Sequence, residues 1–222
     1  NWATKNNVPF IYASSAAVYG LNEVCIENKS YENPINVYGY SKLAFDNYVR
    51  GNFSTIKSQV VGLRYFNVYG YGEQNKGNMA STVFQFYKQY IRHKKIRLFG
   101  EYLNYDKGLQ CRDFIYIDDV IETIMWLYKN NNISGIFNLG TSITASFNEV
   151  AKEIISNHVK VDEKVFKNTV EYIKFPEDLK GRYQSYTLAN MDALRSFGFE
   201  KKFFNIKEGI AKYIEKLKSN HE

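Results

Sequence analysis

The sequence predicts a mixed α/β fold built on a mainly parallel sheet. Several short apolar runs are almost continuous, which is typical of strands buried on both faces of such a sheet. These runs alternate with amphipathic segments of helical length, the pattern of successive βα units. The 222 residues contain no internal repeat and no low-complexity linker. We therefore expect a globular protein in which strands and helices follow one another along the chain.

Three apolar runs in the first half of the chain predict strands, at residues 8–13, 59–65 and 96–99. A helix that begins near Tyr38 connects the first two strands. A second helix, with Asn78 or Ser81 as its N-cap, precedes the third strand and ends near Lys94. The polar, turn-rich residues 100–110 predict a hairpin or flap.

The second half continues the pattern, with strands expected at residues 112–117, 135–139 and 170–173. Two aspartates at residues 118–119 mark the start of a helix, since acids are favoured near a helix N-terminus. Ser146 and Glu149 have the spacing of a capping box at the start of another helix. Residues 175–190 are expected to be irregular, and the last amphipathic helix covers residues 206–218.

Composition limits the kinds of partner. The net charge is +6 and the pI near 9.0, but the basic residues are scattered among acids. This pattern favours an ordinary solvated surface over a nucleic-acid site. Cys25 and Cys111 stand far apart, which argues against a disulfide framework and a zinc site and fits a reducing cytoplasm. The sequence therefore predicts no metal site. No apolar run approaches the ~18–20 residues of a membrane span, so we expect a soluble protein.

The pair most suggestive of chemistry is Tyr38 and Lys42. Residues four apart on a helix share a face. An ammonium beside a phenol favours the anionic form, so we expect the pKa of Tyr38 to fall from about 10 toward that of a general base. With 19 tyrosines and 29 basic residues in the chain, this spacing also arises by chance. Its meaning therefore depends on the neighbouring strand ends.

Ligands bind outside the carboxyl ends of parallel strands, so the residues just after each strand are informative. The first strand is followed by Ser14 and Ser15, and the second by Asn67 and then Lys76. A serine, a Tyr-x-x-x-Lys pair and a parallel sheet together indicate hydride transfer at a hydroxyl-bearing carbon. The tyrosine takes the hydroxyl proton, the serine orients the oxygen, and the lysine lowers the tyrosine pKa and can hold a ribose.

Four segments, in this order, resemble the extended short-chain dehydrogenase/reductase superfamily of nucleotide-sugar epimerases and dehydratases: ASSAAVYG at 13–20, YGYSK at 38–42, LRYFNVYG at 63–70 and RDFIYIDDV at 112–120. Two more, KGNMAS at 76–81 and LKGRYQ at 179–184, resemble the branch that epimerises an ADP-linked heptose at C6. The resemblance covers essentially the whole chain. It implies the C-terminal part of a Rossmann-like doubly wound parallel sheet with an interleaved, smaller α/β substrate domain.

The resemblance also implies roles for individual residues. The catalytic set would be Tyr38 and Lys76 as two acid/base groups, Ser14 polarising the oxygen, and Lys42 serving Tyr38. A lysine can act as a base only where desolvation lowers its pKa, so an exposed Lys76 would be a plain surface residue. The cofactor, NADP, would contact Lys42, Val68 and Lys76. The ADP-heptose substrate would contact Asn67, Asn78, Gln85, Phe99, Arg112 and Tyr183, with the guanidinium of Arg112 on the diphosphate.

This sequence departs from the family pattern in places. Asn78 and Gln85 replace a serine and a histidine, and their spacing of seven predicts one helix face. The loop between Phe99 and Arg112 is longer than expected, which leaves open which of its residues touch substrate. Arg112 has an alternative interpretation as a structural partner of Asp113.

The resemblance implies two domains and a missing segment. Residues 1–69 and 113–140 would belong to the NADP-binding domain, and residues 70–112 and 141–222 to the substrate-binding domain. No Gly-x-Gly-x-x-Gly follows a strand, so we expect on the order of a hundred residues of cofactor-binding βα units upstream. We accordingly expect residues 1–222 alone to bind NADP poorly and to lack activity.

Two other interpretations remain open. One is a different nucleotide-sugar epimerase or dehydratase, such as a 4-epimerase, which does not need a second base at Lys76. The other is a non-catalytic fragment that binds a sugar nucleotide. The cysteine usage predicts a cytoplasmic protein, and family resemblance implies a homo-oligomer.

Overall fold

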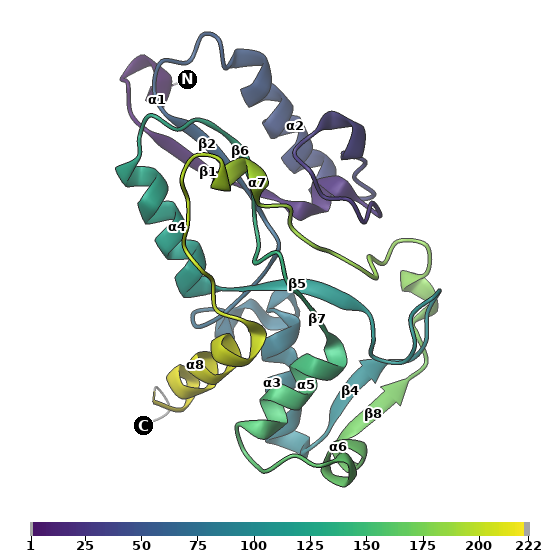
Figure 1. Cartoon of the computed structure of the whole chain (residues 1–222). Coiled ribbons are helices and arrows are strands. Elements are labelled where there is room, and N and C mark those ends of the chain that lie inside the picture. Colours follow the sequence, from purple (N-terminus) through teal and green to yellow (C-terminus); the bar gives the residue numbers. More distant parts are fainter. Residues whose placement is uncertain (1, 220–222) are drawn as a thin grey trace.

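The protein is described here by a computed structural model that covers residues 2–219 (Figure 1). Its longer helices are α2 (Val37–Asn52), α3 (Thr82–His93), α4 (Ile117–Lys129), α5 (Phe147–Ser156) and α8 (Ile206–Ser219), and its shorter ones α1 (Trp2–Lys5), α6 (Glu163–Thr169) and α7 (Asp192–Arg195). The strands are β1 (Phe10–Ser15), β2 (Val60–Tyr65), β3 (Asn67–Tyr69), β4 (Ile96–Phe99), β5 (Cys111–Tyr116), β6 (Gly135–Leu139), β7 (Thr144–Ser146) and β8 (Val170–Ile173). The described residues also form four 3₁₀ helices: η1 (Ala16–Tyr19), η2 (Lys29–Tyr31), η3 (Gln74–Met79) and η4 (Glu177–Leu179).

One sheet has the parallel order β1-β2-β6, as the apolar runs predicted. The central strand β2 is buried along almost its whole length, so its residues alternate between two packed faces. Val60 packs with Tyr12 and with Val49 of α2, whereas Val61 belongs to an apolar cluster that includes Leu127 of α4. Helices on both faces of a parallel sheet make this a doubly wound, Rossmann-like arrangement.

A second group of strands lies farther along the chain. β3 pairs with β5 in parallel, and β5 pairs with β7 in antiparallel fashion. The predicted strands β4 and β8 form a separate parallel pair. Helices α3, α5 and α8 pack together beside these strands in the lower part of Figure 1, and their apolar residues form a second large cluster.

The predicted helix starts are confirmed by their caps. Ser81, not Asn78, caps α3 by accepting the Phe84 N–H, and Ser146 and Glu149 form the predicted capping box at α5. The short elements α6, α7, β3 and β7 were not predicted. With three to seven residues each, they are too short to show a period in the sequence.

The proposed division into two domains remains a prediction. The two apolar clusters correspond to it only in part. Ala189, Met191, Leu194, Phe199 and Phe203 lie in the segment assigned to the substrate domain, yet they pack in the cluster of the β1-β2-β6 sheet. The chain therefore returns to the first sheet near its end, and α7 lies beside β6 (Figure 1).

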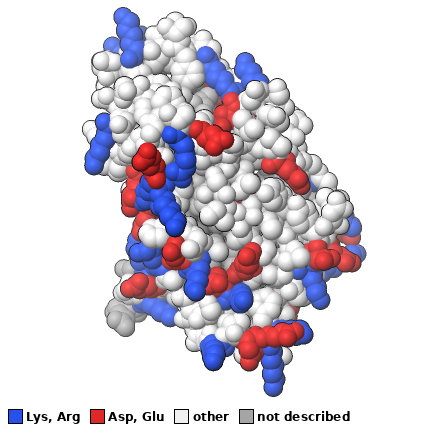
Figure 2. Space-filling view, viewed as in Figure 1, with Lys and Arg blue, Asp and Glu red and all other residues white. Residues whose placement is uncertain are grey.

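Surface charge is mixed on the face shown in Figure 2, where basic and acidic side chains alternate beside a broad uncharged area. At the left of that face several basic side chains lie next to one another, with acidic side chains beside them. Within residues 2–219, no helix combines the length and the apolar character needed to cross a membrane.

Candidate active site

Tyr38 and Lys42 lie in the first turns of α2, whose N-terminus is capped by Asn36. The Lys42 ammonium lies 5.5 Å from the centre of the Tyr38 ring and donates a hydrogen bond to the Ala13 carbonyl oxygen of β1 at 3.0 Å. Tyr38 is 55% exposed, and its hydroxyl has no partner among the described residues. The pair is thus held at the carboxyl end of β1 with its phenol open to a ligand.

A close backbone approach holds the start of α2 against the end of β1. A Cβ added at Gly39 would lie 2.7 Å from the Ala17 carbonyl oxygen of η1, so only glycine allows this contact. Ser15 caps η1 by accepting the Ala17 N–H at 3.1 Å. Ser15 and the first turn of α2 thus both contact η1, and the Ser15 hydroxyl retains its proton for donation.

Ser14 does not lie where its predicted role, orienting the substrate oxygen, would require. Its side chain is 1% exposed, and its hydroxyl donates to Oδ2 of Asp46 at 3.0 Å. Successive side chains on a strand point to opposite faces, so Ser14 faces α2 while Ser15 ends the strand beside η1. The oxygen-orienting role assigned to Ser14 suits Ser15 better.

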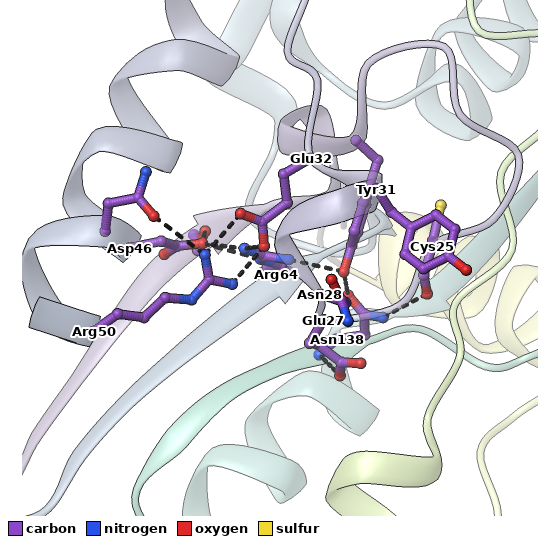
Figure 3. A network of polar contacts seen from close by, with 12 residues as sticks. Cys25, Glu27, Asn28, Tyr31, Glu32, Asp46, Arg50, Arg64 and Asn138 are labelled. Carbon is purple, nitrogen blue, oxygen red and sulfur yellow. Dashed lines mark hydrogen bonds and ion pairs between the residues drawn. The ribbon is translucent and has the colours of Figure 1, made fainter.

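A buried polar network anchors α2 to the sheet (Figure 3). Asp46 lies on the α2 face that carries Tyr38 and Lys42, and it accepts hydrogen bonds from Tyr12 at 2.9 Å and from Nε of Arg64 at 2.9 Å. Arg64 also binds Glu32 at 2.6 Å, and Glu32 in turn pairs with Arg50 of α2. Although burial opposes it, the acids and Tyr19 raise the pKa of Arg64, which therefore stays charged.

The network continues to the far strand of the sheet. Arg64 donates to the Tyr19 hydroxyl at 2.9 Å, and Tyr19 donates to Asn138 of β6 at 2.7 Å. The Asn138 amide nitrogen donates to the carbonyl oxygens of Cys25 and Asn190. The segment that returns to the first sheet near the end of the chain is therefore part of the network. Burial raises the pKa of the Cys25 thiol to about 11, so this thiol is protonated and unreactive at neutral pH.

A second group of predicted residues meets at the start of β5. The Arg112 guanidinium lies over the Tyr183 ring at 4.9 Å, and Tyr183 meets Phe99 edge-on at 5.8 Å. Phe175 and Tyr102 join this aromatic group, with their rings stacked at 3.9 Å. Three residues predicted to contact substrate, from β4, β5 and the irregular segment, are thus brought together.

Arg112 is 8% exposed, and no carboxylate within residues 2–219 pairs with it. Burial lowers the pKa of its guanidinium, which reflects the cost of holding a charge there without a counter-ion. The alternative partner Asp113 instead accepts hydrogen bonds from Thr141, Ser142 and Ala189. That alternative is therefore wrong, and Arg112 is suited to an anionic ligand.

Asn67 and Val68 lie in β3. The Asn67 amide nitrogen donates to the Asp113 carbonyl oxygen at 2.8 Å and to Thr187 at 3.2 Å, so only its carbonyl group is open. Val68 is partly buried against the apolar cluster of the first sheet. Asn67 is thus linked to the Arg112 group through β5.

Lys76 and Asn78 lie in η3, and both are exposed. The predicted common helix face of Asn78 and Gln85 is wrong, because α3 begins only at Thr82. Gln85 instead donates to the Gly77 carbonyl oxygen at 2.7 Å and holds η3 against α3. The Lys76 ammonium makes no hydrogen bond or ion pair with the described residues, so the desolvation that a basic lysine needs does not come from them.

The sequence did not predict the roles of several residues that position α2, among them Arg64, Asp46 and Glu32. One signal was available, since Arg64 interrupts an otherwise apolar strand and such a buried charge needs partners. Asp46 and Glu32 gave no such signal, because acids on a helix and in a loop are usually solvated.

Comparison with known proteins identifies the family of the chain. Residues 1–140 match the NAD dependent epimerase/dehydratase family. Among solved structures, the chain resembles the ADP-L-glycero-D-manno-heptose-6-epimerase of Helicobacter pylori, with 32% identity, a TM-score of 0.79, and coverage of 98% of this chain and 62% of that one.

Two other solved structures are similar in fold. The UDP-N-acetylglucosamine 4-epimerase of Methanobrevibacter ruminantium has 21% identity and a TM-score of 0.79, with 98% of this chain and 66% of that one covered. The dTDP-glucose 4,6-dehydratase of Bacillus anthracis, solved with NAD, has 19% identity and a TM-score of 0.77, with 99% and 64% covered. The chain thus spans less than two thirds of the length of these proteins. With its Tyr38–Lys42 pair at the end of a parallel strand, the chain belongs to the NAD dependent epimerase/dehydratase family.

Proposed function

We propose that the protein takes part in the NADP-dependent epimerisation of ADP-D-glycero-D-manno-heptose at C6, which yields ADP-L-glycero-D-manno-heptose. The observation that carries the chemistry is the Tyr38–Lys42 pair, held by Ala13 at the end of β1. The observation that favours the heptose is 32% identity to a heptose 6-epimerase over 98% of this chain.

A nicotinamide dinucleotide, when bound, supplies the hydride acceptor and donor. The residues present fit one part of it, because Lys42 lies beside Tyr38 where it can also reach a ribose. NAD accompanies several similar structures, and the choice of NADP rests on family resemblance.

In the proposed reaction, Tyr38 removes the proton of the C6 hydroxyl while Ser15 donates a hydrogen bond to that oxygen. The C6 hydride leaves, and a carbonyl group forms at C6. Return of the hydride to the opposite face inverts the centre. Because the oxygen then lies on the other side, a second acid must protonate it, and we assign this role to Lys76.

The exposed Lys76 suits this role only when the bound substrate covers it. Arg112 would hold the diphosphate, and Tyr183 and Phe99 would contact the remainder of the nucleotide sugar. The other proposed contacts are Asn67, Asn78 and Gln85, with Val68 on the cofactor.

Two substitutions in the complete protein test this assignment. Tyr38→Phe and Lys76→Met should each lower kcat for heptose epimerisation by at least about a hundredfold, since each removes one acid/base group. Lys57→Met, which changes an exposed lysine in the loop before β2, is the matched control and should leave kcat unchanged. If Lys76→Met is as active as the wild type while Tyr38→Phe is inactive, the two-base assignment is wrong.

A second candidate is a nucleotide-sugar 4-epimerase or dehydratase. It is favoured by the TM-score of 0.79 to a 4-epimerase, which equals that to the heptose enzyme. Exposure of the Lys76 ammonium also fits this candidate, because a 4-epimerase does not require that base.

A further inference from the structure

The Glu73 carboxylate, in the loop between β3 and η3, is buried and has no role in the proposed reaction. Its Oε1 atom accepts hydrogen bonds from the Gly70 N–H at 3.2 Å and from the Ser81 hydroxyl at 2.8 Å, and its Oε2 atom accepts the Ser81 N–H. The Tyr213 hydroxyl of α8 donates a further hydrogen bond to Oε1 at 3.0 Å. Both oxygens of this buried group are therefore held by donors from two distant parts of the chain.

These contacts close the loop that carries Lys76. Gly70 and Ser81, which end the segment 70–81, are hydrogen-bonded to the same carboxylate. The Lys76 N–H donates to the Glu73 carbonyl oxygen at 3.0 Å, so its backbone is tied to the same residue. The Lys76 side chain itself is exposed. The place of its ammonium thus depends on the backbone of the loop, and that backbone is fixed by Glu73.

The loop has little regular structure of its own. η3 is interrupted at Gly77, where φ is 56° and ψ is −124°. Gly70 and Gly72 have φ angles of 147° and 102°, which favour glycine. A chain of this kind gains conformational entropy once its ends are released. The hydrogen bonds of the Glu73 side chain, together with that of Gln85 to Gly77, therefore restrain a segment that would otherwise vary in shape.

The base of the loop is held by the C-terminal helix α8. Tyr213 is completely buried, and its ring lies 6.2 Å from that of Tyr69, the last residue of β3. Burial and the Glu73 carboxylate raise the pKa of the Tyr213 hydroxyl, which therefore keeps its proton and donates it. A Cβ added at Gly209 would clash with the Tyr69 hydroxyl, so α8 lies close to the end of β3. Glu73 is thus joined to a packed core.

We propose that Glu73 is a positioning residue for Lys76, because it binds both ends of the segment 70–81 and so gives the Lys76 ammonium one place at the site. This inference rests on the proposed function, in which Lys76 is the second acid/base group. Glu73 acts through the backbone of the loop and not on the substrate. A catalytic group displaced by about 1 Å can lose about a hundredfold in rate, so release of one end should slow the step that uses Lys76.

The substitution Glu73→Gln tests this with little change in shape. A carboxylate has two acceptor oxygens, whereas an amide has one, and the amide nitrogen can only donate. In one orientation of the amide the Ser81 N–H loses its acceptor, and in the other the Gly70 N–H does. Either orientation therefore releases one end of the loop.

The measurement is a single turnover of the complete protein with NADP, in which the absorbance of the reduced nicotinamide reports oxidation of the heptose at C6. In the proposed reaction the D-epimer gives its C6 hydroxyl proton to Tyr38, and by reversal the L-epimer gives its proton to Lys76. Glu73→Gln should slow oxidation of ADP-L-glycero-D-manno-heptose at least about tenfold, and that of the D-epimer less than about threefold. A merely structural role of Glu73 would change both rates alike.

The matched control is Glu208→Gln, the same exchange at an exposed carboxylate that accepts the Asn205 N–H at 3.0 Å. It should leave both rates unchanged. Ser81→Gly is a milder second variant, because glycine is accepted at an N-cap and the backbone N–H to Glu73 remains. It removes only the hydroxyl donor and should slow oxidation of the L-epimer about fivefold. If Glu73→Gln does not fold, Ser81→Gly decides the question.

The positioning role is overturned if these variants slow both epimers equally, or neither, while Lys76→Met slows the L-epimer. A failure of the proposed function looks different. The wild type then oxidises neither epimer, or Lys76→Met oxidises the L-epimer like the wild type, and the positioning role fails with it. Circular dichroism at the assay temperature shows that each variant compared is folded.

Discussion

The Nε–H of Arg64 donates to Oδ2 of Asp46 at 2.9 Å, and both side chains are completely buried. Asp46 follows Lys42 by four residues and Tyr38 by eight, so all three lie on one face of α2. The ion pair thus fixes to β2 the helix face that presents the candidate base.

Removing the Asp46 charge should destabilise the fold. Asp46→Asn leaves the buried Arg64 with Glu32 as its only carboxylate among residues 2–219, so we expect the free energy of unfolding to fall by about 3–5 kcal/mol. Urea denaturation measures it. Glu163→Gln is the control, since it breaks an exposed pair with Lys167 and should cost under about 0.5 kcal/mol. Equal losses for the two variants would contradict the anchoring role of Asp46.

Substitution of Ser15 should lower activity, whereas substitution of the adjacent Ser14 should lower stability. Ser15→Ala in the complete protein should lower kcat/KM about a hundredfold, because it removes the donor to the reacting oxygen. Ser14→Ala should keep kcat/KM within about threefold while costing about 1–2 kcal/mol, because it leaves Asp46 short of a donor. The reverse pattern would restore Ser14 to the role that sequence reasoning gave it.

This serine pair shows what the sequence can predict. Apolar runs placed β1 and β2 within two residues of their observed ends, because burial on both faces leaves a continuous signal. The direction of each serine at the end of β1 depends on where the strand stops, and the sequence does not mark that point. Similarly, Asn78 was predicted to share a helix face with Gln85, because the start of α3 depends on the Ser81 cap and not on periodicity. The Asp46–Arg64 pair joins distant segments, which a single sequence cannot reveal.

Stability should depend on pH through His158. Burial, together with Lys218 and Lys94, lowers the pKa of His158 below 6.5, and its ring packs on Tyr90 at 5.1 Å. A depressed folded-state pKa means that protonation favours the unfolded state. The contribution of His158 is therefore complete above about pH 6.5 and is lost as the pH falls below that value.

His158→Gln should remove this dependence. The difference in melting temperature between wild type and variant should shrink from about pH 7.5 to about pH 5.5. His93→Gln, which changes an exposed histidine, is the control and should follow the wild type at both pH values. A difference that stays constant with pH would show that His158 does not titrate as described.

We propose that Tyr38 and Lys76 serve epimerisation of an ADP-heptose at C6. The most direct measurement is proton NMR of ADP-D-glycero-D-manno-heptose incubated with the complete protein and NADP. We predict that the C6 epimer accumulates to equilibrium with the wild type and not with Tyr38→Phe. An unchanged heptose spectrum, under conditions in which UDP-glucose is converted to its C4 epimer, would contradict the claim.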